Sequence, residues 1–131
     1  MSKIDATNVL DRIGEKDVLL CAHKVWPNEY LTALRIASEA SNVIRQACRT
    51  DPKLFTRKSE KGIVGGLFYL LGRRCGSTRT QRQIARSLNT TEITIGDCCR
   101  LWVEPLQNYS RHRTRERRSA DVNRRSLKKL A

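Results

Sequence analysis

The sequence predicts an all-α protein with one domain of five helices over residues 1–110 and a basic tail over residues 111–131. The first observation behind this prediction is that apolar residues recur every three or four positions, which is the spacing of one face of an α-helix. The second is a stretch at residues 61–102 in which a strongly apolar helix leads into two further helices. We identify no convincing β-strand pattern and no internal repeat. One domain with a tail also suits a length of 131 residues.

The N-terminal half of the sequence predicts two helices with a sharp boundary between them. Residues 4–24 carry an imperfect apolar stripe that Gly14 interrupts, so they predict one bent helix or two shorter helices. The sequence Trp-Pro-Asn at residues 26–28 marks the boundary, because proline ends or precedes a helix and asparagine is a good helix cap. Residues 29–49 then predict a longer helix with one face on a core.

The next segment predicts a loop followed by a buried helix. Residues 51–60 are polar and basic and are expected to form the loop. Residues 61–74 are apolar on most sides of a helix, which predicts that neighbouring helices surround it. The glycines in this helix lack the G-K-[ST] ending of a phosphate-binding loop, so we expect them to permit close helix packing. They are Gly62, Gly65 and Gly66.

Residues 80–104 predict a helix-turn-helix. Thr80 and Gln83 have the spacing of a capping box at the start of its first helix. Asn89 falls at the turn, where a residue that tolerates a left-handed backbone is needed, and Thr90 or Thr91 can cap the second helix. The predicted inward positions are Ile84, Ala85 and Leu88 in the first helix, and Ile95, Cys98 or Cys99, and Trp102 in the second. Pro105 is then expected to kink the second helix or to end its first section.

Two segments together resemble one known family. They are GIVGGLFYLLGR at residues 62–73 and TQRQIARSLNTTEITIGDCCRLW at residues 80–102. They are similar to the second cyclin-like repeat of the transcription initiation factor B family, which comprises archaeal factor B and eukaryotic factor IIB. That family has an Ala/Gly-rich helix ending in tyrosine, then T-Q-x-x-I-A, then a recognition helix with V-T-E-V-T-I-R-x-x-Y. The matching residues here are Gly65, Gly66, Tyr69, Thr80, Gln81, Ile84, Ala85, Thr91, Glu92, Ile93, Thr94 and Ile95.

The resemblance implies a single five-helix cyclin-like domain that acts as a DNA-binding transcription factor. Its implied partners are duplex DNA and, in addition, TATA-binding protein or RNA polymerase. The chain has room for one repeat and no zinc ribbon, whereas the family normally has two repeats and a ribbon. Gly96 replaces the arginine that reaches the family's promoter element, and Cys99 replaces its tyrosine. Despite these departures the cyclin-like fold is still expected. The family's promoter-element specificity is not expected, because the arginine is absent.

The charge of the chain favours a polyanionic partner, with nucleic acid first and an anionic membrane surface second. Lysine and arginine number 26 against 13 acidic residues, for a net charge of +13 and a pI near 10.2. Much of this excess lies in residues 111–131, which are too polar to fold alone and predict either a disordered segment or a helix ordered by a partner. This tail suits phosphate binding, but it suits RNA, an acidic protein patch or a membrane surface equally well.

The candidate nucleic-acid-binding residues are of two kinds. Basic side chains around the motif and in the tail are expected to contact the sugar-phosphate backbone, and outward positions of the second helix are expected to enter the major groove. The candidates are Arg73, Arg74, Arg79, Gln81, Arg82, Thr91, Ile93, Thr94, Gly96, Arg100, Arg111, Arg113, Arg115, Arg117 and Arg118. Glu92 and Asp97 also fall on the predicted outward face, where a carboxylate is unfavourable beside phosphates unless it accepts from a cytosine amine.

Other classes of function have little support in the sequence. The two histidines are far apart and no nucleophile pattern accompanies them, so we expect no enzyme activity and no small-molecule substrate. The five cysteines include no C-x-x-C pair, which predicts buried thiols in a reducing compartment and no metal or cofactor. No apolar run reaches the roughly 20 residues of a membrane span, so a cytoplasmic, nucleoid-associated or nuclear protein is expected.

Two alternatives to a factor B-like DNA-binding protein stay open at this point. In the first, the cyclin-like fold is a protein-interaction module that docks transcription machinery, and Glu92 and Asp97 belong to a protein interface. In the second, the chain is a repressor-like or mobile-element regulator that matches only the general rules of a helix-turn-helix.

Overall fold

The computed structural model describes the backbone of residues 9–130 and the side chains of residues 9–115. Within these residues all regular structure is helical and there is no strand, which confirms the predicted all-α class. No helix in the described part has the length and hydrophobicity to cross a membrane. The elements are η1 (Val9–Arg12), α1 (Glu15–Val25), α2 (Tyr30–Thr50), α3 (Glu60–Arg74), α4 (Gln81–Leu88) and α5 (Glu92–Leu130).

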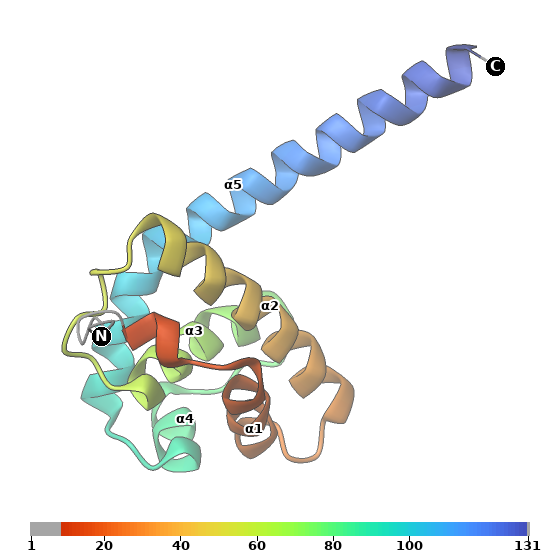
Figure 1. Cartoon of the computed structure of the whole chain (residues 1–131). Coiled ribbons are helices and arrows are strands. Elements are labelled where there is room, and N and C mark those ends of the chain that lie inside the picture. Colours follow the sequence, from red (N-terminus) through yellow and green to blue (C-terminus); the bar gives the residue numbers. More distant parts are fainter. Residues whose placement is uncertain (1–8, 131) are drawn as a thin grey trace.

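Helix α3 lies at the centre of the fold, as its apolar sequence predicts. It contacts α1, α2, α4 and α5, so that little of its surface is left for water (Figure 1). Its large apolar side chains are buried on several sides of the helix, because neighbouring helices cover each side. The buried ones are Ile63, Val64, Leu67, Phe68 and Leu71.

The N-terminal half forms two shorter elements and then a long helix. Gly14 separates η1 from α1 and is the N-terminal cap residue of α1. Of the two alternatives for residues 4–24, the described part therefore confirms two shorter helices and not one bent helix. The expectation that Asn28 caps α2 is wrong. Helix α2 begins at Tyr30 with Glu29 as its cap residue, and no side-chain hydrogen bond is made there. The carboxylate of Glu29 instead turns towards the segment between α3 and α4.

The loop before α3 is anchored by an aromatic residue that the sequence did not identify as core. Phe55 is 0% exposed, and its ring centroid lies 4.4 Å from that of Trp102 in α5. The indole Nε1 of Trp102 in turn donates a hydrogen bond of 2.7 Å to the carbonyl oxygen of Ile63. The polar loop expected at residues 51–60 is therefore attached to α5 through the buried Phe55 ring, and Trp102 connects this contact to α3.

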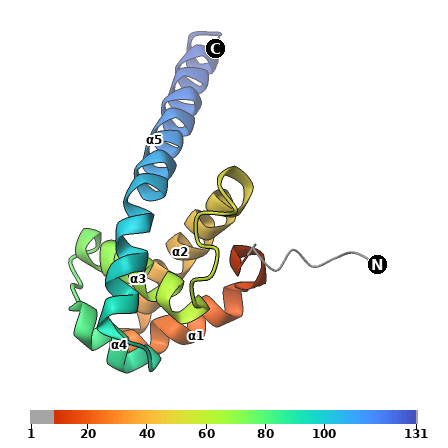
Figure 2. The ribbon, with the colours of Figure 1, turned by 90° about the vertical axis from the view of Figure 1, so that its left-hand side faces the viewer.

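Close contact between α3 and α5 depends on glycine, which confirms the expected role of the glycines in α3. A Cβ atom added to Gly66 would lie 2.7 Å from the backbone nitrogen of Cys99 and 2.9 Å from the carbonyl carbon of Cys98. Such distances are shorter than van der Waals contact, so any side chain at this position would force the two helices apart. Figure 2 shows α3 and the first part of α5 side by side.

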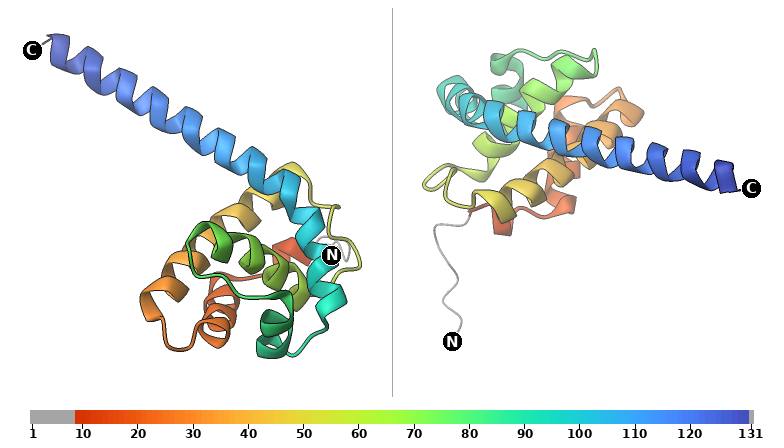
Figure 3. Two further views of the ribbon diagram at one scale, coloured as in Figure 1. Left: turned by 180° about the vertical axis from the view of Figure 1, so that it is seen from behind. Right: turned by 90° about the horizontal axis from the view of Figure 1, so that it is seen from above.

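Helix α5 includes both the second helix of the predicted helix-turn-helix and most of the basic tail. It continues from Glu92 to Leu130 with Pro105 inside it, so of the two expectations for Pro105 the one that it ends a section of the helix is wrong. Of the two alternatives for the tail, the backbone of residues 111–130 is helical. The part around Pro105 is held in place because Leu106 is buried and Tyr109 packs partly against the core. The C-terminal part of the helix projects away from the other helices (Figures 1 and 2 and the left view of Figure 3).

None of the five cysteines forms a disulfide bond. Cys98 and Cys99 are buried, as expected, whereas the other three are only half-buried. Burial raises the pKa of Cys98 to about 11 from an ordinary value of 9.0, because an ionised thiolate loses its hydration in the core. Burial likewise raises the pKa of Cys21 and of Cys99.

The raised pKa of Cys98 predicts a loss of stability at alkaline pH. The folded state holds this proton more tightly than the unfolded state does, so its contribution is fully present below about pH 9 and is lost as the pH rises towards 11. We expect the urea concentration at the unfolding midpoint, measured under reducing conditions, to decrease as the pH is raised from about 9 to about 11. The fall should be smaller for Cys98→Ala, which keeps the Cβ atom and removes the thiol. Equal falls for the two proteins would contradict the prediction.

Candidate nucleic-acid interface

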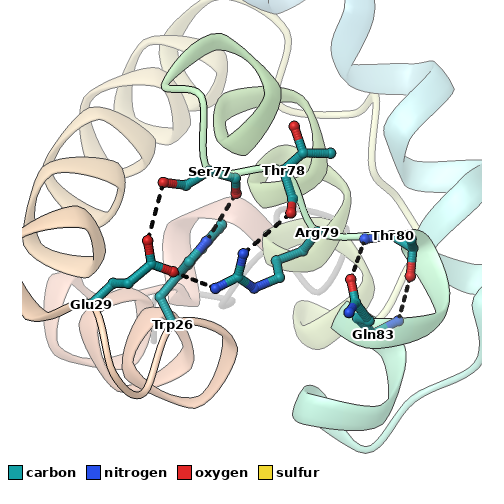
Figure 4. Close-up of polar contacts among 7 residues, drawn as sticks. All are labelled: Trp26, Glu29, Ser77, Thr78, Arg79, Thr80 and Gln83. Atoms are coloured by element: carbon teal, nitrogen blue, oxygen red, sulfur yellow. Dashed lines mark hydrogen bonds and ion pairs between the residues drawn. The ribbon is translucent and has the colours of Figure 1, made fainter.

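The connection from α3 to α4 ends in the predicted capping box (Figure 4). The hydroxyl of Thr80 accepts a hydrogen bond of 3.0 Å from the backbone N–H of Gln83. The side-chain oxygen of Gln83 accepts one of 2.9 Å from the backbone N–H of Thr80. Helix α4 ends at Leu88, and Asn89 has a left-handed backbone with φ of 56°. Both expectations about the ends of this helix are therefore confirmed.

A second threonine cap starts α5 after a short turn. The hydroxyl of Thr91 accepts a hydrogen bond of 3.2 Å from the backbone N–H of Thr94, and the two hydroxyl oxygens lie 2.7 Å apart. All the positions predicted to face inward from α4 and α5 are buried, because they pack against α3 and the Phe55 loop. They are Ile84, Ala85, Leu88, Ile95, Cys98, Cys99 and Trp102.

The outward face of α5 differs from the prediction most at Gly96, and Thr94 and Asp97 on this face are half-buried. Thr91, Glu92, Ile93 and Arg100 are exposed as expected, and Ile93 is 77% exposed although it is a large apolar residue. Gly96, however, is buried.

Gln81 of α4 is the cause of this burial. A Cβ atom added to Gly96 would lie 3.0 Å from the side-chain oxygen of Gln81. Gln81 and Gly96, which were both predicted to contact DNA, thus contact each other. The Gln81 side chain covers the position where the resemblance places an arginine. Gly96 is therefore not a contact residue.

Both carboxylates of this face have basic neighbours from other parts of the chain. The Oε2 atom of Glu92 lies 4.0 Å from the Nε atom of Arg82 in α4. Asp97 is half-buried and lines a cavity of about 270 Å³ together with Arg57 and Lys58 of the loop before α3. The charge of Glu92 is therefore partly compensated by Arg82, whereas Asp97 shares a cavity with two basic residues and forms no ion pair with them within the described residues. Arg57 and Lys58 were missed because only the fold brings their loop beside α5.

Arg79 holds two parts of the fold together. Its Nη2 atom forms an ion pair with Glu29, and its guanidinium carbon lies 5.9 Å from the ring centroid of Trp26. The indole Nε1 of Trp26 donates a hydrogen bond of 3.0 Å to the carbonyl oxygen of Ser77 (Figure 4). Only 27% of the Arg79 side chain is exposed. This placement makes Arg79 a structural residue, and it does not belong to the exposed face of α4 and α5.

The remaining arginines fall into two groups. Arg82, Arg86 and Arg100 are exposed on α4 and the first part of α5. The second group lies where α5 leaves the other helices. There Arg74 donates a hydrogen bond of 2.8 Å to the hydroxyl of Ser110, and Arg113 pairs with Glu39 at 2.7 Å.

The two groups lie on different parts of the fold. The first is on α4 and the first turns of α5, whereas the second is at Arg74, the last residue of α3, and at the part of α5 around Ser110. Arg73 stays close to its own helix, with its guanidinium carbon 5.6 Å from the ring centroid of Tyr69. Arg111 and Arg115 are exposed, and the side chains of Arg117 and Arg118 lie outside the described residues.

Comparison with known proteins adds no further information about this interface. No protein-family model, curated protein or solved structure matches the chain. The resemblance to the factor B family consequently depends on the sequence motifs alone and stays a prediction.

Proposed function

We propose that this protein binds duplex DNA with α4 and α5 acting as the helix-turn-helix of a cyclin-like domain, and that it acts in transcription as a factor B-like protein. The observation that carries the proposal is the capped α4–Asn89–α5 arrangement, which exposes Thr91, Ile93 and Arg100 beside the basic face of α4. This is the arrangement by which a helix-turn-helix presents its second helix to the major groove.

The exposed side chains have chemistry that suits a groove. The methyl groups of Ile93 can contact the methyl group of thymine, and the hydroxyl of Thr91 can bond to a base edge or a phosphate. Arg100 can reach a guanine or a phosphate, and Arg82 and Arg86 can contact phosphates from α4. With a net charge of +13, the chain also carries the long-range attraction expected of a nucleic-acid-binding protein.

The projecting part of α5 supplies the second contact region in this proposal. Arg111 and Arg115 are exposed and free to meet the phosphate backbone. Arg113 contributes only when it leaves Glu39, because its Nη1 atom lies 2.7 Å and 2.9 Å from the two carboxylate oxygens. We therefore assign Arg113 a smaller share of the binding than its neighbours.

The dependence of DNA affinity on salt tests the proposal. We expect the full chain to bind a labelled random duplex at about 50 mM NaCl, with an affinity that falls steeply as salt rises. The double variant Arg86→Ala/Arg100→Ala should bind at least about 10-fold more weakly and lose about two units of slope, because it loses two phosphate contacts. Anisotropy titrations over a series of salt concentrations measure both quantities.

Arg12→Ala/Lys16→Ala is the matched control, because it removes the same charge from exposed positions in η1 and α1. It should bind nearly as well as the unaltered chain. The proposal fails if the unaltered chain does not bind duplex DNA at low salt, or binds with no dependence on salt. Equal losses in the two double variants would show that net charge alone drives binding.

A protein-interaction module is the second candidate, and the exposure of Ile93 beside Glu92 favours it. An exposed apolar side chain next to carboxylates also suits a basic, partly apolar partner surface. In this alternative the partners are TATA-binding protein or RNA polymerase. The variant Glu92→Ala/Asp97→Ala separates the candidates. If purified partners bind it as they bind the unaltered chain, the interaction role is contradicted, and unchanged DNA binding counts against insertion of α5 into the groove.

A further inference from the structure

The loop before α3 places two basic residues beside the first turns of α5. Arg57 and Lys58 line a cavity of about 270 Å³ whose other walls are Ser59, Thr94 and Asp97. The position of the loop is well defined, because the backbone N–H of Lys58 donates a hydrogen bond of 3.0 Å to the carbonyl oxygen of the buried Phe55. The two basic side chains are thus held next to α5 by the core.

Arg57 has an unusual backbone for its residue type. Its φ angle is 69°, in the left-handed region that glycine and asparagine tolerate and that other residues seldom adopt. Strain of this kind persists where the surrounding structure imposes it, and it is concentrated at binding and catalytic sites. A glycine would fit the backbone here without strain, so the arginine side chain is the feature that needs an explanation.

The charges around this cavity leave the two basic residues available to a ligand. Arg57 is exposed and Lys58 is half-buried, and Asp97 is the carboxylate among the cavity-lining residues. Among the ion pairs found within residues 9–115, none involves Arg57 or Lys58. The residues that line the cavity therefore carry a net positive charge, and two of them, Thr94 and Asp97, belong to α5.

The geometry of α5 relates this cavity to Arg82. At 3.6 residues per turn, Asp97 lies about 140° around the helix from Glu92, with Ile93 and Arg100 between them. Arg82 lies beside Glu92 on one flank of this face, and Arg57 and Lys58 lie beside Asp97 on the other. Basic residues from two different segments thus border the exposed face on both sides.

We propose that Arg57 and Lys58 contact the phosphates of one strand of duplex DNA, while Arg82 and Arg86 contact the other strand across the major groove. This inference rests on the proposed DNA binding and adds to it a loop outside α4 and α5. The contacts carry no base specificity, because they reach only phosphate oxygens. They position the first turns of α5 between the two strands, and they neutralise the charge of Asp97 as the strand approaches.

The variant Arg57→Gly tests this inference, because it separates binding from folding. Glycine suits the backbone at this position, so we expect the thermal midpoint to stay the same or rise. Duplex affinity should fall by about 3- to 10-fold, equally for unrelated sequences, and the salt slope should fall by about one unit. Lys58→Ala should have the same effect on binding. Lys53→Ala is the control, since this exposed lysine belongs to the same loop but does not line the cavity.

The possible outcomes are distinct. If the unaltered chain binds DNA and both Arg57→Gly and Lys58→Ala bind equally well, the inference is wrong and the proposed function stands. If Lys53→Ala loses as much affinity as Arg57→Gly, general attraction explains the result and the inference is also wrong. A loss confined to one DNA sequence would overturn the assignment to phosphate. If the unaltered chain does not bind duplex DNA at all, the proposed function itself fails.

Discussion

Replacing Trp102 with alanine is expected to lower the free energy of unfolding by about 3–5 kcal/mol, the usual cost of emptying a large aromatic site. The side chain is fully buried, its ring lies 4.4 Å from that of Phe55, and its Nε1 atom donates to the carbonyl oxygen of Ile63. The variant therefore leaves a cavity and removes the indole hydrogen bond where α3, α5 and the Phe55 loop meet. Urea unfolding followed by circular dichroism measures the change.

Two further variants make this prediction specific. Trp102→Phe keeps most of the ring contacts and loses the hydrogen bond, so its loss should be smaller, at about 1–3 kcal/mol. Val103→Ala alters the next residue, which is 45% exposed, and should have little effect. If Trp102→Ala unfolds at the same urea concentration as Val103→Ala, the central role assigned to Trp102 is wrong.

Replacing Gly66 with valine is expected to destabilise the protein by about 3 kcal/mol, at the upper end of the usual cost of overpacking. The atoms nearest to an added Cβ belong to the backbone of Cys98 and Cys99, at 2.9 Å and 2.7 Å. Backbone in a packed helix cannot rotate away as a side chain can, so α5 would have to move as a whole. The urea midpoint should fall while the helical content of the folded state stays the same.

Gly62→Val is the matched control for this prediction. The atoms nearest to a Cβ at Gly62 belong to the side chains of Thr94, Ser59 and Cys98, at distances from 2.5 Å to 3.3 Å. These side-chain atoms can be displaced without moving a helix, although displacing Ser59 loses the hydrogen bond of 3.0 Å that it accepts from the backbone N–H of Gly62. The loss of stability should therefore be smaller than at Gly66. Equal urea midpoints for the two valine variants would contradict the idea that backbone contact sets the cost.

The features that sequence reasoning predicted well depend on neighbouring residues. The capping box of Thr80 and Gln83 and the left-handed turn at Asn89 involve groups within a few positions of each other, so local hydrogen bonding and backbone preference determine them. The buried positions Ile95 and Trp102 follow from helical periodicity, because side chains three or four residues apart share a face.

The features that it missed involve residues far apart in the chain. Gly96 was placed on the outer face, but Gln81 of another helix covers it. Arg79 was assigned to the interface, and its partner Glu29 lies in a segment fifty residues away along the chain. Phe55 was assigned to a polar loop because its sequence neighbours are polar and basic, whereas its ring completes the core beside Trp102. Periodicity cannot identify such partners, since it describes one helix at a time.

The stretch at residues 61–102 shows which parts of the candidate interface depend on local sequence and which depend on contacts between distant segments. By itself the sequence determined that this stretch forms helices, where α4 begins and ends, and which faces pack inward, because these follow from short-range hydrogen bonds and periodic burial. Only the tertiary structure decided which side chains surround the outer face of α5. It brought Arg57 and Lys58 to one flank, covered Gly96 with Gln81 and withdrew Arg79 into an ion pair with Glu29. The charge and shape that a DNA strand would meet there arise from three separate segments, and packing alone sets their distances.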